Sequence, residues 1–372
     1  MRASYRRFAA SVSVLIVAAG VVAVSGRAQA APTAQYLIAT GTNVGGGPHV
    51  KLFTTDGVQR SSFFAYDPAF RGGVNVAVGD LDGDGLLEII TGAGPGGGPH
   101  VRVFTEGGTS IDAASFFAYP IGFDGGVNVG VSDVDGDGDD EILTAPASGG
   151  GPHVKVVDVT EEGLILEREF FAYDTAFLGG VSVAGAYVDS SNNEGIVVGA
   201  GPGGGPHVKT FRHDGVVMGS WFAYAVGYLG GVQVSSWFAN DDEVEEILTA
   251  SMDGPGHVRS FSIMGAASGP NFFAFGGATR GANVGSIGDS AGGPLVVAPY
   301  TAGSGVTGRT AGGGATALTI NPYPGFLGGM RMAIGFGIFD SDPTATTSST
   351  TTSASTSSTT STSTTTSTTL AT

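Results

Sequence analysis

Two copies of one acidic pattern, D-x-D-G-D-G-x-x-E, carry the clearest chemistry in the sequence. They span residues 80–88 and 133–141. Three carboxylates at alternate positions of a tight loop converge on one point, and the glycines between them let the backbone turn that sharply. Calcium suits such a site because it takes about six to eight hard oxygen ligands in a flexible geometry. The pattern therefore predicts two structural calcium sites.

Each predicted site uses four side chains and one backbone carbonyl. The ligands of the first site are Asp80, Asp82, Asp84 and Glu88, with the carbonyl of Leu86. The ligands of the second are Asp133, Asp135, Asp137 and Glu141, with the carbonyl of Asp139. Two decayed copies of the pattern are weaker metal candidates, and their remaining polar residues are Asp189 in the third copy and Asn240, Asp242 and Glu246 in the fourth.

Three other interpretations of the acidic pattern compete with a calcium loop between two strands. An EF-hand would need Glu at the twelfth loop position, where this chain has Thr91 and Thr144, and its flanks would be helices. Magnesium prefers a stricter octahedral geometry. A solvated acidic turn would leave three close carboxylates repelling one another without a cation. Calcium is the ion that the pattern favours.

The acidic loops belong to a repeat of about fifty residues, which must position them. One marker of the repeat is G-G-P-H-V or a close relative, with histidines at His49, His100, His153, His207 and His257. A second is an aromatic cluster such as Phe63-Phe64-Ala65-Tyr66, and a third is a glycine-led strand such as residues 72–76. In the first full unit, alternation and glycine-rich turns indicate four strands, at Val74–Gly79, Glu88–Thr91, Val101–Phe104 and Ser115–Tyr119.

Four short strands in each unit predict an all-β fold, a β-propeller of about six four-stranded blades. The later units are degenerate, so seven blades remain open. The mature chain begins with a second strand, Tyr36–Gly41, and ends with a first strand, Met330–Phe339. Pairing of these two strands would close the ring and remove its free sheet edges.

The sequence resembles the FG-GAP repeats of the integrin α-subunit propeller and of bacterial FG-GAP/VCBS-type proteins. Val78-Gly79-Asp80-Leu81-Asp82-Gly83-Asp84-Gly85 and the following Ile89-Ile90-Thr91-Gly92-Ala93-Gly94-Pro95 carry the resemblance. It covers most of residues 36–342 and implies a propeller with calcium in loops between the first and second strands of a blade. In that family calcium is mainly structural, the propeller commonly binds other macromolecules, and seven blades are usual.

The other repeated side chains have structural explanations. The five histidines could form a metal ring, but each lies in the same turn of its own blade, so a hydrogen-bonded structural role is favoured. The aromatic clusters could stack on carbohydrate, but they recur in every complete blade, which favours packing between blades. Polar residues that break the repeat, namely His213-Asp214, Glu161-Glu162, Glu167 and Glu169, make no recognisable nucleophile and base pair.

The two ends of the chain lie outside the repeat. Residues 1–30 are typical of a signal peptide, with arginines, an apolar stretch and Ala28-Gln29-Ala30 before a cleavage site; an uncleaved anchor is the alternative. Residues 31–342 are the predicted propeller domain. Residues 343–372 are a Ser/Thr-rich tail expected to be disordered.

Composition limits the partners. The formal net charge of −17 disfavours nucleic acid and anionic membrane surfaces, and no transmembrane helix is expected in the mature chain. The absence of cysteine excludes disulfides and thiolate chemistry. The expected function is that of a secreted or cell-surface calcium-binding propeller, an adhesion or protein-interaction module and not an enzyme, with an unknown protein or glycan ligand. A polysaccharide-acting propeller enzyme and a purely structural surface protein are the alternatives.

Overall fold

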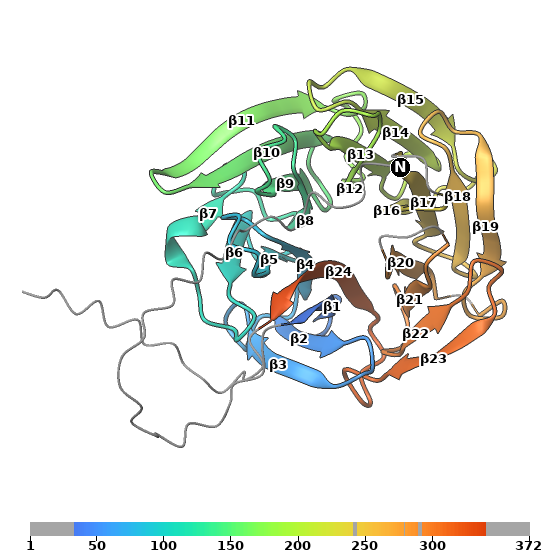
Figure 1. Cartoon of the computed structure of the whole chain (residues 1–372), viewed down its shortest axis with the longest axis horizontal. Coiled ribbons are helices and arrows are strands. Elements are labelled where there is room, and N and C mark those ends of the chain that lie inside the picture. Colours follow the sequence, from blue (N-terminus) through green and yellow to red (C-terminus); the bar gives the residue numbers. More distant parts are fainter. Residues whose placement is uncertain (1–32, 241–243, 279, 289–291, 340–372) are drawn as a thin grey trace, which may run out of the picture. The chain divides into compact units, whose positions relative to one another are not determined.

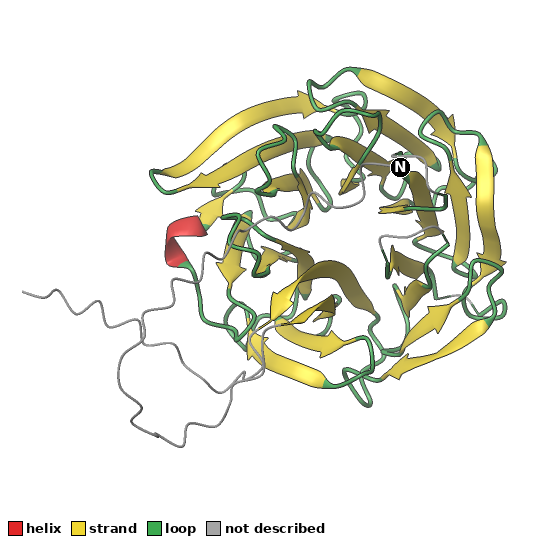
Figure 2. Ribbon diagram, in the orientation of Figure 1, coloured by secondary structure: helices red, strands yellow, loops and turns green. Residues whose placement is uncertain are grey.

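The computed structural model describes residues 33–240, 244–278, 280–288 and 292–339. This part of the chain forms six four-stranded antiparallel sheets arranged as a ring, and its one helical element is the short 3₁₀ helix η1 (Asp112–Ala114) (Figures 1 and 2). The predicted all-β propeller of six blades is confirmed, and seven blades are excluded. The predicted signal peptide (1–30) and Ser/Thr-rich tail (343–372) lie outside the described residues.

Blade I contains β24 (Met330–Phe339), β1 (Thr33–Thr42), β2 (His49–Thr54) and β3 (Gln59–Phe64). Blade II contains β4 (Val74–Gly79), β5 (Glu88–Ala93), β6 (His100–Phe104) and β7 (Phe116–Phe117). Blade III contains β8 (Val127–Ser132), β9 (Glu141–Pro146), β10 (His153–Thr160) and β11 (Gly163–Phe171). Blade IV contains β12 (Val181–Ala186), β13 (Gly195–Ala200), β14 (His207–Phe211) and β15 (Val217–Phe222). Blade V contains β16 (Val232–Trp237), β17 (Glu246–Ser251), β18 (His257–Phe261) and β19 (Ala267–Phe273). Blade VI contains β20 (Ala282–Ser286), β21 (Leu295–Pro299), β22 (Val306–Arg309) and β23 (Ala315–Ile320).

The two ends of the described chain close the ring within blade I. Strand β24 pairs antiparallel with β1, in a register that runs from Thr33↔Phe339 to Thr42↔Met330. On its other side β24 contacts the first strands of both neighbouring blades, β4 and β20 (Figure 1). The predicted pairing of N-terminal and C-terminal strands is confirmed. Ring closure therefore gives β1 a pairing partner on both of its edges, and the blades on either side pack against β24.

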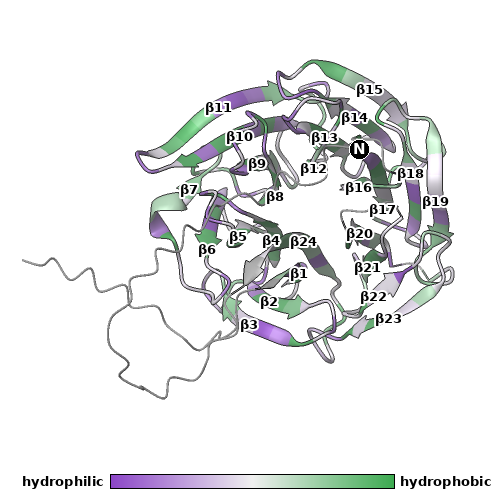
Figure 3. Cartoon of the chain, viewed as in Figure 1, coloured by the Kyte–Doolittle hydropathy of each residue, from purple (hydrophilic) through white to green (hydrophobic). Residues whose placement is uncertain are grey.

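The hydrophobic core lies between the blades. All six residues of β4 and all six of β5 are buried, because neighbouring blades pack against these inner strands. The strands nearest the centre of the ring are coloured mainly as hydrophobic in Figure 3. The largest fully buried side chains are concentrated on the second strands and include Ile89, Ile142, Ile196 and Ile247. Burial of one such side chain stabilises the fold by about 1.5–3 kcal/mol. An almost continuous apolar run in the second strand is therefore what the ring requires.

A tyrosine in five of the six connections between blades links one blade to the next. Its buried hydroxyl donates to the backbone carbonyl of the next blade's repeated histidine, at 2.7–2.9 Å, in the pairs Tyr66–His100, Tyr119–His153, Tyr173–His207, Tyr224–His257 and Tyr323–His49. The last pair spans the closure of the ring. At the boundary between blades V and VI, Phe275 replaces the tyrosine and Gly305 replaces the histidine. The two residues are lost together, as expected of partners in one interaction.

The repeated basic residue of the third strand reaches back across the same boundary. Lys51 donates to the carbonyl of Pro322 at 2.7 Å, and Lys209 donates to the carbonyl of Ala172 at 2.8 Å. Equivalent bonds are made by Arg102, Arg259 and Arg309. Several of the few cations in this acidic chain thus serve the contacts between blades.

Candidate metal sites

The two acidic loops connect the first and second strands of neighbouring blades. Residues 80–88, the first acidic loop, join β4 to β5 in blade II, and residues 133–141, the second acidic loop, join β8 to β9 in blade III. Gly83 and Gly85 have φ values of 67° and 85°, in the left-handed region that glycine adopts without a steric penalty. These turns fold each loop back so that its carboxylates face inward.

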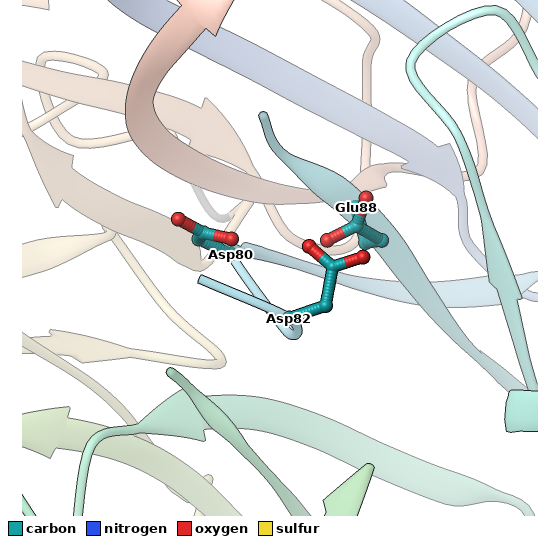
Figure 4. A group of neighbouring side chains, drawn as sticks. All are labelled: Asp80, Asp82 and Glu88. Carbon is teal, nitrogen blue, oxygen red and sulfur yellow. The ribbon is translucent and has the colours of Figure 1, made fainter. Parts of the chain in front are cut away.

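Three carboxylates converge in each loop. One oxygen from each of Asp80, Asp82 and Glu88 lies within 4.8 Å of the others (Figure 4). The second acidic loop repeats this arrangement with Asp133, Asp135 and Glu141. No lysine or arginine in the described ranges forms a salt bridge with these six carboxylates. All six are ligands predicted from the sequence, and the fold brings them together in two groups of three.

The glutamate of each loop braces the loop backbone. Oε2 of Glu88 accepts a hydrogen bond from the Leu81 amide at 3.0 Å, and Oε2 of Glu141 accepts one from the Val134 amide at 2.7 Å. Each glutamate is the first residue of its second strand, so the strand fixes its position. One carboxylate oxygen of each thus holds the loop closed.

A buried atom of Asp80 tests whether a cation fits the first acidic loop. Its Oδ2 accepts a hydrogen bond from the Gly85 amide at 2.9 Å, but its Oδ1 is buried and has no hydrogen-bond partner. Such an atom is costly unless it is satisfied, and a hard cation satisfies it. With two further carboxylates within reach, the donor set is all oxygen and fits calcium.

Two predicted side-chain ligands lie outside the convergent groups. Asp84 Oδ1 accepts a hydrogen bond from the Leu86 amide at 2.8 Å, and Asp137 Oδ1 accepts one from the Asp139 amide at 3.0 Å. Both carboxylates therefore stabilise the turn itself. The assignments of Asp84 and Asp137, and of the carbonyls of Leu86 and Asp139, stay predictions.

Burial and the neighbouring negative charges raise the pKa of carboxyl groups in both loops. Burial, followed by the charges of the loop aspartates, raises the pKa of Glu88 to about 8. Burial, followed by the nearby Asp135 and Glu167, raises the pKa of Glu141 to about 9. Burial also raises the pKa of Asp80 and Asp133. A bound cation would compensate the negative charge of the ionised carboxylates and so favour their ionisation.

The raised pKa values predict how pH affects the metal-free protein. Both glutamates ionise near pH 4.5 when unfolded but only near pH 8 and 9 when folded, so their stabilising contribution is complete below about pH 4.5 and is lost as pH rises through 8 and 9. We expect the melting temperature of metal-free protein to fall between about pH 5 and pH 9, and the variant E88Q/E141Q to lose most of that fall. Melting curves monitored by circular dichroism measure it, and an equally steep fall in the variant would contradict it.

The decayed loops keep fragments of the arrangement. In the fourth copy, Oε2 of Glu246 accepts a hydrogen bond from the Ala239 amide at 3.0 Å, as in the intact loops, and Oε1 accepts one from Asn240 at 3.0 Å. Asp242 lies outside the described residues. In the third copy, Asp189 accepts a hydrogen bond from the Ser191 amide at 2.8 Å, and hydrogen bonding to the Ser191 side chain, followed by this amide, lowers the pKa of Asp189. Within the described ranges, neither decayed loop forms a convergent carboxylate group.

The sequence did not predict a site role for several acidic side chains near the loops. The side chains of Asp139 and Asp140 in the second acidic loop face the first acidic loop, and Asp140 Oδ2 accepts a hydrogen bond from the Asp80 amide at 3.1 Å. Asp158 on β10 and Glu167 on β11 lie near the second loop; burial, followed by the charges of Asp135 and Asp137, raises the pKa of both. The carboxylates of Asp139 and Asp140 lie within the acidic pattern, where only the Asp139 carbonyl had been assigned.

The repeated histidines do not form a metal ring. They lie on five different blades, and each packs against a phenylalanine of its own blade with ring centroids 4.6–5.0 Å apart. His49, His207 and His257 each hydrogen-bond through Nε2 to a side chain of the adjacent fourth strand. These contacts support the predicted structural role.

The aromatic clusters divide their roles between two surfaces. The first aromatic residue packs against a phenylalanine of the next blade, as with Phe63 and Phe104 at 4.8 Å between centroids. The second, for example Phe64, is about half exposed and covers the histidine of its own blade. The prediction of packing between blades is correct for the first residue and wrong for the second, because alternate residues of a strand face opposite sides.

The polar residues that break the repeat include two in ion pairs. Asp214 pairs with Arg212, and Glu169 lies 3.2 Å from His153 and 3.8 Å from Lys155.

The described residues contain no apolar helix long enough to cross a membrane.

Comparisons with known proteins support the fold. Residues 72–110, which contain the first acidic loop, match the family model described as FG-GAP repeat, in agreement with the resemblance seen in the sequence. No curated protein sequence matches the chain.

Similar solved structures differ in what their names describe. A protein of unknown function from Bacteroides caccae aligns with 81% of this chain and 99% of its own at 11% identity and a TM-score of 0.49. AztD from Citrobacter koseri aligns with 82% and 98% at 9% identity and a TM-score of 0.44. A rhamnogalacturonan lyase from Bacillus licheniformis aligns with 78% and 57% at 15% identity and a TM-score of 0.41. Alignments this distant say nothing about what this chain binds.

Proposed function

We propose that this six-bladed propeller, which carries an FG-GAP repeat at residues 72–110, binds two calcium ions that stabilise its ring. The observation that carries the proposal is the pair of convergent carboxylate groups, each without a basic partner in the described ranges. In the first acidic loop the buried, unpartnered Oδ1 of Asp80 adds to this support. Asp80, Asp82 and Glu88 would hold one ion, and Asp133, Asp135 and Glu141 the other.

Calcium supplies charge compensation at these loops and no chemistry on a substrate. The residues of the chain do the rest: the glycines set the turns, and Glu88 and Glu141 brace the loop backbone. The ions would join the first and second strands of blades II and III and so fix two of the inner strands of the ring. A structural role for calcium in this family points the same way.

The wider proposal is that of an exported or cell-surface module that binds a protein or glycan and has no catalytic activity. Exposed aliphatic residues support a protein-binding surface: Ile121, Leu178, Leu229 and Leu327 are each more than half exposed in the connections that lead from one blade to the next. We propose that these residues contribute to one apolar surface, because a contiguous exposed apolar patch marks an interaction site. Binding of labelled protein to whole cells, lost in the variant L178S/L229S/L327S, is the expected result; equal binding by the variant contradicts it.

Calcium binding is tested by titration of the metal-free protein. Isothermal titration calorimetry is expected to show two sites, with one lost in the variant D82N and the other in D135N, because each change removes a negative ligand from one loop. The surface variant D124N removes the same charge from an exposed connection and is expected to keep both sites. Heat of dilution alone in the unmodified protein would contradict the proposal.

A further inference from the structure

A backbone contact joins each acidic loop to the next blade. The amide of Asp140 donates to the Asp80 carbonyl at 2.7 Å, and the amide of Glu194 donates to the Asp133 carbonyl at 2.7 Å. The same contact joins Glu245 to Tyr187 at 2.9 Å. Tyr187 stands where an intact loop has its first aspartate, so this contact forms whether or not the loop has metal ligands. It is therefore a feature of the blade boundary that holds the following blade against the loop.

The contact places the residue before it directly over the loop. Asp139 lies over Gly83 so closely that a Cβ on this glycine would collide with the Asp139 carboxylate. Asn193 occupies the same position over the second loop, and its Oδ1 lies 3.1 Å from where a Cβ on Gly136 would be. The Nδ2 of Asn193 donates to the Val134 carbonyl at 2.9 Å, which fixes the amide there. Each intact loop is thus covered by an oxygen-bearing side chain of the next blade.

The residue that covers a loop has an oxygen-bearing side chain only where the loop itself has convergent carboxylates. Asp139 and Asn193 cover the two loops that have convergent carboxylates. Val244 precedes Glu245 and so takes this position at the third loop, where Tyr187 replaces the first aspartate. A residue that only packs against the backbone need not change when the loop loses its carboxylates. A metal ligand is expected to be lost together with the other ligands.

We propose that Asp139 and Asn193 are cation ligands donated across the blade boundary, each binding directly or through one water. Asp139 of blade III would complete the site of the first acidic loop in blade II, and Asn193 of blade IV would complete that of the second loop in blade III. The inference rests on the proposed calcium binding. The buried Oδ1 of Asp80, which lacks a hydrogen-bond partner, points to a cation in the first acidic loop, over which Asp139 lies. Each ion then connects two blades.

The test measures each site alone by calcium titration of the full chain. In a D135N background, which leaves the first site, D139A is expected to weaken calcium affinity about 10- to 100-fold, the usual loss when a supporting ligand is removed. D139N keeps an oxygen and is expected to lose less. In a D82N background, N193A is expected to weaken the second site while D139A has a smaller effect. The charge-matched control D124N should leave both affinities unchanged.

Circular dichroism and Trp221 and Trp237 fluorescence establish that each variant folds. If D139A does not fold, D139N decides, with reduced first-site affinity supporting the inference and unchanged affinity overturning it. Unchanged affinity in folded D139A, or an equal loss in D124N, also overturns it. Failure of the unmodified protein to bind calcium would instead refute the proposed function, so the two failures are distinguishable.

Discussion

Removal of calcium is expected to lower the free energy of unfolding of the ring by about 5 kcal/mol. An ion that binds only the folded chain contributes about 2.7 kcal/mol at a concentration 100-fold above its dissociation constant, and the proposal has two such sites. The metal-free loops retain unfavourable contacts, because their crowded carboxylates repel one another and burial disfavours their charge. Thermal or urea unfolding with calcium, and after its removal by a chelator, measures the change.

The matched control for this prediction is the double variant D82N/D135N, which disables one ligand in each loop. Its stability is expected to respond little to calcium or chelator, because neither loop retains three carboxylates. Chelation that destabilises the variant as much as the unmodified protein would mean that the effect arises elsewhere. Unfolding curves that do not change with chelator in the unmodified protein would contradict the calcium sites themselves.

Deletion of strand β24 is expected to abolish cooperative folding. A chain that ends at Gly329 lacks β24 and leaves one edge of β1 unpaired over the whole register from Thr33 to Thr42. It also removes the inner strand that separates β4 from β20, and with it the buried Met330. The exposed edges would then be free to pair with other chains. Loss of the sharp thermal transition and growth of aggregates by light scattering are the expected observations.

The control for the deletion is a chain that ends at Ser341, the boundary of the compact unit that contains all six blades. It keeps β24 and is expected to melt at the temperature of the full chain. A sharp transition at the full-length temperature in the chain that ends at Gly329 would show that ring closure contributes little to stability.

The repeat made most of the fold predictable from sequence. Markers such as the Gly-Pro-His turn recur in register, so one interpretable unit, residues 74–119, located the strands of the others. The order of parts at the two ends predicted the pairing of β24 with β1, which the structure confirms. Most strand limits moved only slightly; the fourth strand of blade II, predicted at Ser115–Tyr119, is the shorter Phe116–Phe117.

The site was predictable only within one loop. Six of the assigned carboxylates converge because their spacing is local, and the turn geometry follows from the glycines. The side chain of Asp139 lies over a loop more than fifty residues away, and spacing within the pattern gives no information about that contact. Asp84 and Asp137 are assigned by their alternation, and each accepts a hydrogen bond from a backbone amide two residues later, as Asp135 also does. Their role as ligands stays a prediction.

The pairing of β1 with β24 also determines when the molecule can finish folding. The partner of Ile38 is Ile334, so the first strand to leave the ribosome waits for almost the whole chain before it is covered. Blades II to VI can form as they emerge, because all their strands are contiguous in the sequence. Until β24 is made, however, β1 has one unpaired edge. We therefore expect blade I to be the part of the ring most prone to aggregate during synthesis.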